Sequence, residues 1–182
     1  VSINNGLTDG NVYSLAISPS GDIFAGTWNG AVFRSTNDGN IWTQVNAGIP
    51  EMVGKEVRSL AINVSGHIFA GTWWDGGIFR STDNGASWMQ INSGLTNRTI
   101  TSLAINSGGS IFAGAYRGGI YRSTDNGDSW TPANAGLTNT WIWCLATSIN
   151  GDIFVGTEAA GIFRSTDDGM NWVAVNSGMT DL

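Results

Sequence analysis

The chain repeats one eight-residue motif four times without gaps, and this repetition limits the folds open to it. The motif reads Ser-x-Asp-x-Gly-x-x-Trp, with Asn in place of Asp in the first copy, and its tryptophans are 46, 42 and 42 residues apart. Such a period indicates a repeat architecture in which each repeat is one supersecondary unit. The shared positions of these octets are Ser35, Asn37, Gly39 and Trp42; Ser81, Asp83, Gly85 and Trp88; Ser123, Asp125, Gly127 and Trp130; and Ser165, Asp167, Gly169 and Trp172.

Each repeat reads as four short β-strands, and no segment has helical periodicity. In the first repeat we expect strands over 12–17, 23–27, 32–35 and 42–46, separated by turns rich in Gly and Asn, as hairpins require. Four strands in about 42 residues is the size of one propeller blade. The sequence therefore predicts an all-β fold, a β-propeller of four-stranded antiparallel blades over about 11–48, 57–94, 100–136 and 142–178, within a single domain spanning 1–182.

The octet resembles the Asp-box, also called the bacterial neuraminidase repeat. Proteins with this repeat include sialidases, oligoxyloglucan-type hydrolases, sortilin-like receptors and photosystem II assembly factors. The resemblance covers essentially the whole chain and implies a propeller. The first copy departs from the motif at Asn37, but Asn makes the same turn hydrogen bonds as Asp, so the expected fold is unchanged.

We expect the octets to be architecture and not a metal or catalytic site, and we expect no cofactor. An Asp or Asn at the head of a tight turn accepts hydrogen bonds from N–H groups about two residues on, and the glycine supplies a positive φ. The carboxylate spacing fails the alternating pattern of an EF-hand. The tryptophans should cover the blade edges, and the arginine before each octet should stack or pair with a carboxylate. These arginines are Arg34, Arg80, Arg122 and Arg164.

Small residues in the first strand of each repeat, such as Ser14 and Ala16, suit strands that crowd around a central axis. Cys144 takes the serine position in the last repeat and is expected to be a small buried residue. His67 is expected to be a solvated turn residue.

A ligand site should lie where the repeats differ. The connections between the second and third strands and between successive blades open onto one face of a propeller, and both vary here. The candidate residues are Trp28, Arg58, Trp73, Trp74, Arg98, Tyr116, Arg117, Trp141, Trp143 and Glu158. Aromatic side chains beside Arg, Asn and Glu suit a sugar-binding surface and equally a protein interface. The same rings could instead cover seams between blades.

Catalysis is the weaker hypothesis. A sialidase needs three converging arginines, a tyrosine nucleophile and an acid, but the family's Arg-Ile-Pro segment is absent and only four repeats are present, where sialidases have six. A glycosidase pair needs two carboxylates about 5–10 Å apart, and no spacing singles out a pair. The residues considered are Arg58, Arg98, Arg117, Tyr116 and Glu158 for the first site, and Glu158 with Asp75 or Glu56 for the second. No catalytic residue is assigned.

The composition of the chain limits the classes of partner that it is expected to bind. Eight basic against 14 acidic residues give a net charge of −6, with no basic run, which disfavours binding to nucleic acid. No apolar stretch approaches the ~20 residues of a membrane span. Low charge with abundant polar residues suits a secreted or cell-surface protein, taken here as bacterial. The favoured interpretation is a non-catalytic binding or assembly scaffold; the alternatives are a glycan-binding module and a fragment of a carbohydrate-active enzyme.

The first residues repeat a later segment. Val1-Ser-Ile-Asn-Asn-Gly-Leu matches Val173-Ala-Val-Asn-Ser-Gly-Met, which directly follows an octet tryptophan. We expect residues 1–7 to form an extra outer strand of a preceding or closing blade, and the complete gene to encode another octet just before Val1. The expected partners are therefore other blades of a longer chain or another copy of this chain, for example two copies in an eight-blade ring.

Overall fold

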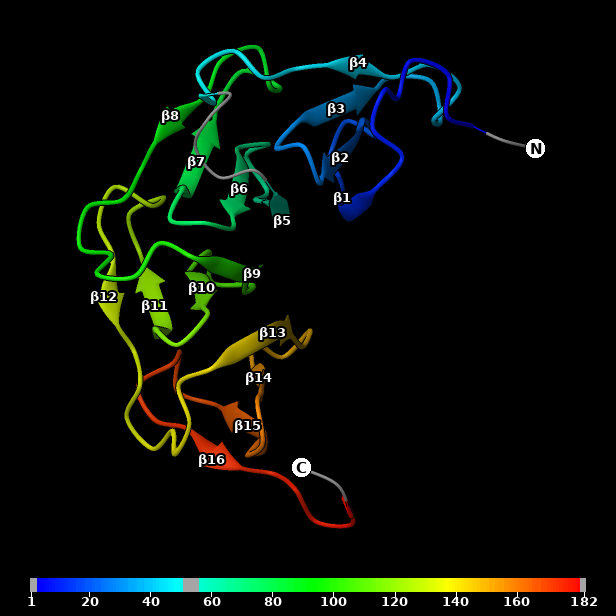
Figure 1. Cartoon of the computed structure of the whole chain (residues 1–182). Helices are drawn as coiled ribbons and strands as arrows, with labels where there is room; N and C mark the ends of the chain where they lie inside the picture. Colours follow the sequence, from blue (N-terminus) through cyan, green and yellow to red (C-terminus); the bar gives the residue numbers. More distant parts are fainter. Residues whose placement is uncertain (1–2, 51–55, 181–182) are drawn as a thin grey trace.

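The computed structural model describes residues 3–50 and 56–180, and within these ranges it consists of sixteen strands and no helix. The strands form four separate antiparallel sheets of four, each in chain order (Figure 1). Blade 1 is β1 (Val12–Ile17), β2 (Ile23–Thr27), β3 (Val32–Ser35) and β4 (Thr43–Gln44). Blade 2 is β5 (Val57–Ile62), β6 (Ile68–Thr72), β7 (Gly77–Ser81) and β8 (Met89–Gln90). Blade 3 is β9 (Ile100–Ile105), β10 (Ile111–Ala115), β11 (Gly119–Ser123) and β12 (Thr131–Pro132). Blade 4 is β13 (Ile142–Thr147), β14 (Ile153–Thr157), β15 (Gly161–Ser165) and β16 (Val173–Ala174).

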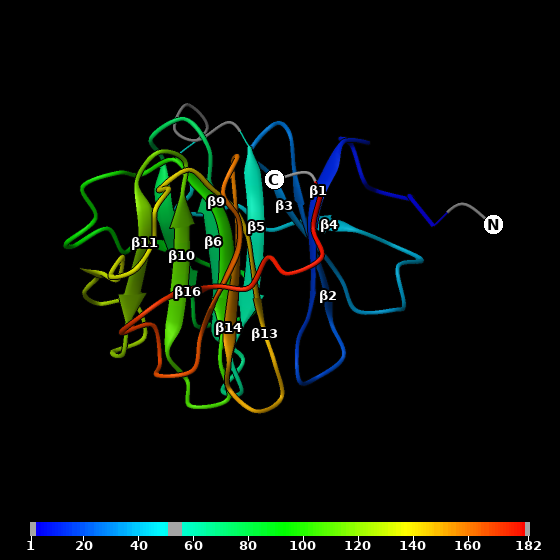
Figure 2. The same ribbon diagram turned by 90° about the horizontal axis from the view of Figure 1, so that it is seen from below.

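The blades follow one another around an open arc, with blades 1 and 4 at its ends (Figure 1). The long strands β1, β5, β9 and β13 line the inside of the arc, and the two-residue strands lie outside. Seen from below, the longer strands run roughly side by side, so the turns gather at two opposite ends (Figure 2). The predicted all-β architecture of four-stranded antiparallel blades is confirmed.

The fourth strand of each blade is shorter than the expected 42–46. Pairing in blade 1 ends early because the Asn46 side-chain oxygen accepts the Val32 N–H at 2.7 Å. The side-chain oxygen thus takes the place of a backbone carbonyl of the fourth strand. Backbone pairing with the third strand stops there, and the chain continues toward the next blade. Asn92, Asn134 and Asn176 do the same for Ile78, Ile120 and Ile162.

The octet tryptophans join each blade to the segment before it. The Trp88 indole N–H donates to the Val45 carbonyl at 2.8 Å, and its backbone N–H donates to Ala47 at 2.8 Å. Trp42 makes the same two bonds to the carbonyls of Ile3 and Asn5. Residues 3–5 therefore take the place, at blade 1, that the segment after the fourth strand takes at each later blade.

Within the octet, the hydrogen bonds differ from those expected. Asp83 accepts the N–H of Ser87, four residues on, at 2.9 Å, and the Ser81 hydroxyl accepts the Gly85 N–H at 2.8 Å. The reach is longer because two successive residues, Asn84 and Gly85, both have positive φ. The preceding arginine of every blade is ion-paired with an aspartate, as the sequence indicates.

The small residues of the innermost strands lie against the next blade, not around the axis. Ser14 donates to the Val57 carbonyl at 3.2 Å, and Ala16 packs into the core between blades 1 and 2. The expectation that Cys144 is buried is wrong, since it is exposed. It lies on the face of blade 4 that has no following blade among the described residues.

Candidate functional site

A β-bulge in each innermost strand builds the candidate site. The pairing register of β1, β5, β9 and β13 shifts by one residue near the start of the strand. A bulge leaves its extra residue unpaired and re-aims the side chain. The four bulge residues are Tyr13, Arg58, Thr101 and Trp143, and together with Trp73 they line one hollow of about 120 Å³.

The rings around this hollow come from different blades and contact one another. Trp73 of blade 2 and Trp143 of blade 4 lie nearly parallel, with centroids 6.4 Å apart and an interplanar angle of 14°. Tyr116 of blade 3 lies 5.2 Å from Trp73 and 5.5 Å from Trp143. Trp141 extends the group, 5.7 Å from Tyr116. We call Tyr13, Trp73, Tyr116, Trp141 and Trp143 the axial aromatic cluster.

Two arginines stack on the axial aromatic cluster. The Arg58 guanidinium lies 4.4 Å from the Tyr13 centroid and 4.9 Å from that of Trp73, and it also pairs with the buried Glu56. Arg117 lies 4.2 Å from the Trp141 centroid. Among the described residues Arg117 has no carboxylate partner, and its exposed guanidinium lies against ring faces. Such contacts are worth about 0.5–2 kcal/mol each and hold both cations next to solvent.

The turns that carry these rings are held by the main chain. The N–H of Trp73 donates to the Glu56 carbonyl, and that of Tyr116 donates to Thr99. Asn97 adds a clamp, since its amide donates to the Tyr116 carbonyl at 3.0 Å. The ring at position 116 is therefore positioned by bonds that do not involve the side chain itself.

Asp9 holds the corresponding turn of blade 1. Its carboxylate accepts the N–H groups of Asn11 and Asn29 at 3.0 and 2.8 Å. Burial acts to raise the pKa of Asp9, but these hydrogen bonds outweigh it and leave the pKa below the usual value. The carboxylate stays charged and its oxygens are occupied by hydrogen bonds to the turn, so they are not available to a ligand.

The remaining sequence-predicted residues lie around the cluster. Trp74 touches Trp73 edge-on and is 66% exposed, and Trp28 contacts Tyr13 at 5.9 Å. Glu158 accepts the Trp143 indole N–H at 2.7 Å. Arg98 is exposed, and among the described residues its side chain makes no ion pair and no ring contact.

Sequence reasoning missed Tyr13 and Thr101. Both lie at the second position of an innermost strand, where a regular alternating strand would pair them with the neighbouring strand. The bulge removes them from that pairing and redirects their side chains. A signal was present: this position reads Tyr, Arg, Thr and Trp in the four repeats, although the residues after it are nearly constant.

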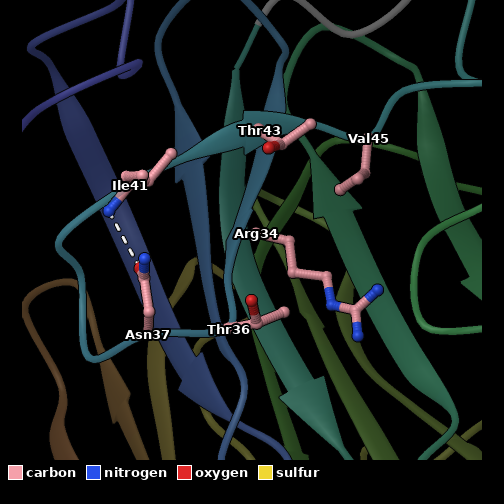
Figure 3. Close-up of a pocket in the computed structure, with 6 residues that line it drawn as sticks. All are labelled: Arg34, Thr36, Asn37, Ile41, Thr43 and Val45. Atoms are coloured by element: carbon pink, nitrogen blue, oxygen red, sulfur yellow. Dashed lines mark hydrogen bonds between the residues drawn. The ribbon is translucent and has the colours of Figure 1, made fainter.

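The other end of the blades has hollows that recur, and these belong to the scaffold. A groove of about 340 Å³ in blade 1 is lined by Arg34, Thr36, Asn37, Ile41, Thr43 and Val45 (Figure 3). In the close-up, the Ile41 N–H donates to Asn37 beneath the β4 strand (Figure 3). Blade 4 has an equivalent groove at Arg164, Thr166, Asp167, Asn171, Val173 and Val175. Because the same positions are hollow in both blades, neither groove marks a specific site.

The octet carboxylates are likewise hydrogen-bonded within their own turns. A side-chain hydrogen bond from Ser129, followed by that residue's N–H, lowers the pKa of Asp125 to about 2. Asn171 acts in the same way on Asp167, lowering its pKa to about 2. In the part of the chain that the structure describes, no group of three His, Cys, Asp or Glu side chains could hold a metal ion. Within the same ranges no helix is long and apolar enough to cross a bilayer.

Comparison with known proteins places the fold. A family model described as "WD domain, G-beta repeat" matches residues 4–33, which cover the segment before β1, the strands β1 and β2, and the start of β3. No curated protein matches the sequence. Among solved structures, an ancestral GH74 enzyme superposes with a TM-score of 0.74 and 23% identity over 97% of this chain and 27% of its own.

Two further structures show the same arrangement. The extracellular domain of a protein described as a hybrid two-component system from B. thetaiotaomicron gives a TM-score of 0.72, with 23% identity over 88% of this chain and 22% of its own. YCF48 bound to D1 peptide gives 0.71, with 16% identity over 93% of this chain and 56% of its own. At these identities the likeness shows the propeller fold alone. The chain spans about a quarter of the first two structures and just over half of the third.

Proposed function

We propose that the chain is a non-catalytic binding scaffold, part of an Asp-box type propeller, that holds a protein segment on its axial aromatic cluster. The observation that supports this proposal is the convergence of variable side chains from all four blades. Bulge residues of all four blades and turn rings of blades 2 and 3 meet at the end opposite the octets, at positions that the repeat does not need.

The size and chemistry of the hollow favour a peptide. At about 120 Å³ it is smaller than the ~300–1,000 Å³ of small-molecule sites, but it can accept one inserted side chain. Trp, Tyr and Arg are the residues that dominate binding energy at protein interfaces. The likeness to YCF48, a propeller whose structure was solved bound to a peptide, supports the same mode of use here.

The resemblance also supports a location outside the cell. One similar structure is an extracellular domain of a B. thetaiotaomicron protein, and others are GH74 enzymes. We infer a secreted or surface-exposed bacterial protein. The octets agree with the Asp-box pattern in their serine, glycine and tryptophan and, in three of the four, in the aspartate, with Asn37 in the first. In each turn the serine hydroxyl accepts the glycine N–H.

The test is selection of ligands from a random peptide library displayed on phage, with the whole chain immobilised. Enriched peptides should bind wild type saturably in solution, and Trp73→Ala or Trp143→Ala should weaken binding by at least about thirtyfold, the usual effect of losing an interface hot spot. Met170→Ala is the matched control, because Met170 is also exposed and apolar but lies at the octet end. Equal losses in control and cluster variants, or no enrichment, would remove the proposal.

A glycan ligand is the second candidate, and Trp74 favours it. Trp74 and Asp75 have positive φ, 57° and 64°, but so do Arg117 and Ala159 in the corresponding turns of blades 3 and 4, so this backbone conformation belongs to the turn and not to a ligand site. The turn leaves the Trp74 side chain 66% exposed. It presents a tryptophan ring to solvent, where a sugar face could stack. A panel of xylo-oligosaccharides titrated against wild type and Trp74→Ala distinguishes the two candidates. Binding lost in Trp74→Ala and kept in Trp143→Ala would favour the glycan, and release of shortened sugars would indicate hydrolysis instead.

A further inference from the structure

The three interfaces between consecutive blades use one repeated fit. The first residue of each later innermost strand is β-branched and packs against a glycine in the second strand of the blade before. A Cβ added to that glycine would lie within 2.5–2.6 Å of the β-branched side chain, so the fit needs glycine. The pairs are Gly26 with Val57, Gly71 with Ile100, and Gly114 with Ile142.

The two ends of the arc carry the unmatched halves of this fit. Val12 is the β-branched residue of blade 1, yet it is 37% exposed, whereas its three counterparts are fully buried. Gly156 is the glycine of blade 4, and a Cβ there would meet only the Cys144 sulfur. Leu15 and Ile17, on the same side of β1 as Val12, are 64% and 67% exposed. In the later blades the counterparts of Leu15 are largely buried.

The charges at the two ends also match. Across the interface between blades 3 and 4, Arg122 of one blade pairs with Asp168 in the octet of the next. Arg164 occupies the place of Arg122 in blade 4, on the exposed side, where it pairs with Asp152 of its own blade. Asp38 occupies the place of Asp168 in blade 1, is exposed, and forms no ion pair among the described residues.

The tail after blade 4 has the shape that receives an octet tryptophan. Gly48, Gly94 and Gly136 each lie against the carbonyl of the next tryptophan, and Gly6 does so for Trp42. Gly178 has the same positive φ but no described atom within 4 Å of its added Cβ. Residues 175–178 can therefore replace 3–6 on Trp42 of another molecule, bond for bond, without loss of hydrogen bonds.

We propose that the exposed side of blade 4 binds blade 1 of a second copy, with the geometry of the internal interfaces. The contact buries Leu15, Ile17 and Val12 on one molecule against Phe154 and Gly156 on the other. Because the two patches differ, the contact is head-to-tail, and two such contacts close a ring of two copies if four blades turn through half a circle. Closure is therefore part of what the mass measurement tests, since species larger than a dimer would mean that the ring does not close. This surface is distinct from the axial aromatic cluster and does not depend on the function proposed above.

The experiment is the mass of the 182-residue chain in solution, measured by light scattering during gel filtration from micromolar to submillimolar concentration. A species of twice the 19.2 kDa chain mass is expected at the upper end. Leu15→Asp should abolish it, while Val64→Asp, at an apolar residue elsewhere that is 95% exposed against 64% for Leu15, should not. Circular dichroism confirms that both variants are folded.

Charge reversal tests the pairing itself. Asp38→Arg and Arg164→Asp should each raise the dissociation constant of the dimer by roughly tenfold or more, since each sets like charges opposite one another at two contacts. An equimolar mixture of the two variants restores opposite charges at both contacts of a mixed ring, so it should recover the dimer. A monomer at every concentration, or a dimer indifferent to Leu15→Asp and to charge reversal, would overturn the proposal.

Discussion

Trp130→Phe tests whether the octet tryptophans hold the blades together. Trp130 is only 2% exposed, and its indole N–H donates to the Ile91 carbonyl of the preceding blade at 2.8 Å. Phenylalanine keeps an aromatic ring but removes the donor and part of the volume. A buried carbonyl left without its partner costs about 1–3 kcal/mol, and partial loss of a packed side chain costs about 1 kcal/mol more. We expect the free energy of unfolding to fall by about 2–4 kcal/mol.

Urea unfolding followed by circular dichroism measures this loss. The matched control is Trp28→Phe, because Trp28 is half-exposed and its side chain contacts only Tyr13 among the described aromatic rings. A surface change of this kind is expected to stay within about 0.5 kcal/mol. If the two variants lose equal stability, the indole bond between blades does not stabilise the stack, and the reasoning fails.

Asn37→Asp combined with Ile41→Ser should give blade 1 the extra side-chain hydrogen bond of the other octets. NMR titration should then find the pKa of the new carboxyl below its usual value. Asn37→Asp alone should lower this pKa less, because Ile41 has no side-chain donor. The other three octet aspartates have lowered pKa values, two of them about 2, so their stabilisation is complete above the ordinary value of 3.8 and is lost as the pH falls toward 2. Urea midpoints measured at successive pH values should fall over that window. Gly114→Ala sets a methyl group about 2.5 Å from Ile142 and should cost about 1–3 kcal/mol, whereas Gly10→Ala, in open surroundings, should be nearly neutral by the same measurement.

The sequence predicted the blades well because the same pattern occurs four times. The first three strands of blade 1 begin and end where alternation and turn residues place them. The short fourth strand was not predictable from strand propensity, because Asn46 ends the pairing with its side chain. The recurrence of Asn at this place in every repeat could have indicated that role.

The candidate site was only partly predictable. Variation among the repeats singled out Trp73, Tyr116 and Trp143, which the structure brings together. Tyr13 and Thr101 were missed because a bulge depends on the pairing register between strands, which the alternation of one strand does not reveal. Cys144 was misplaced because burial at its position depends on a following blade.

The third and seventh residues of the octet differ together in the first repeat, and this explains why that repeat tolerates Asn. In the other three octets the second carboxylate oxygen accepts a side-chain hydrogen bond, as Asp125 does from Ser129 at 2.5 Å. In the first octet the donor position is Ile41, and Asn37 has only one acceptor oxygen, which is used by the Ile41 N–H. A carboxylate there would lack the partner for its second oxygen. Asn at 37 and Ile at 41 are therefore matched to each other.

The separation of constant and variable ends follows from how each turn is held. At the octet end, side chains make the turn: Ser123 and Asp125 bond its N–H groups, and a neighbouring blade's arginine closes over it. A substitution there disturbs two blades at once. At the opposite end, the turn carrying Tyr116 is held by a backbone bond and by the Asn97 clamp, so the identity of the ring is free to change. Chemical specificity can therefore vary at this end without loss of the stack, and this is where the aromatic and cationic side chains converge.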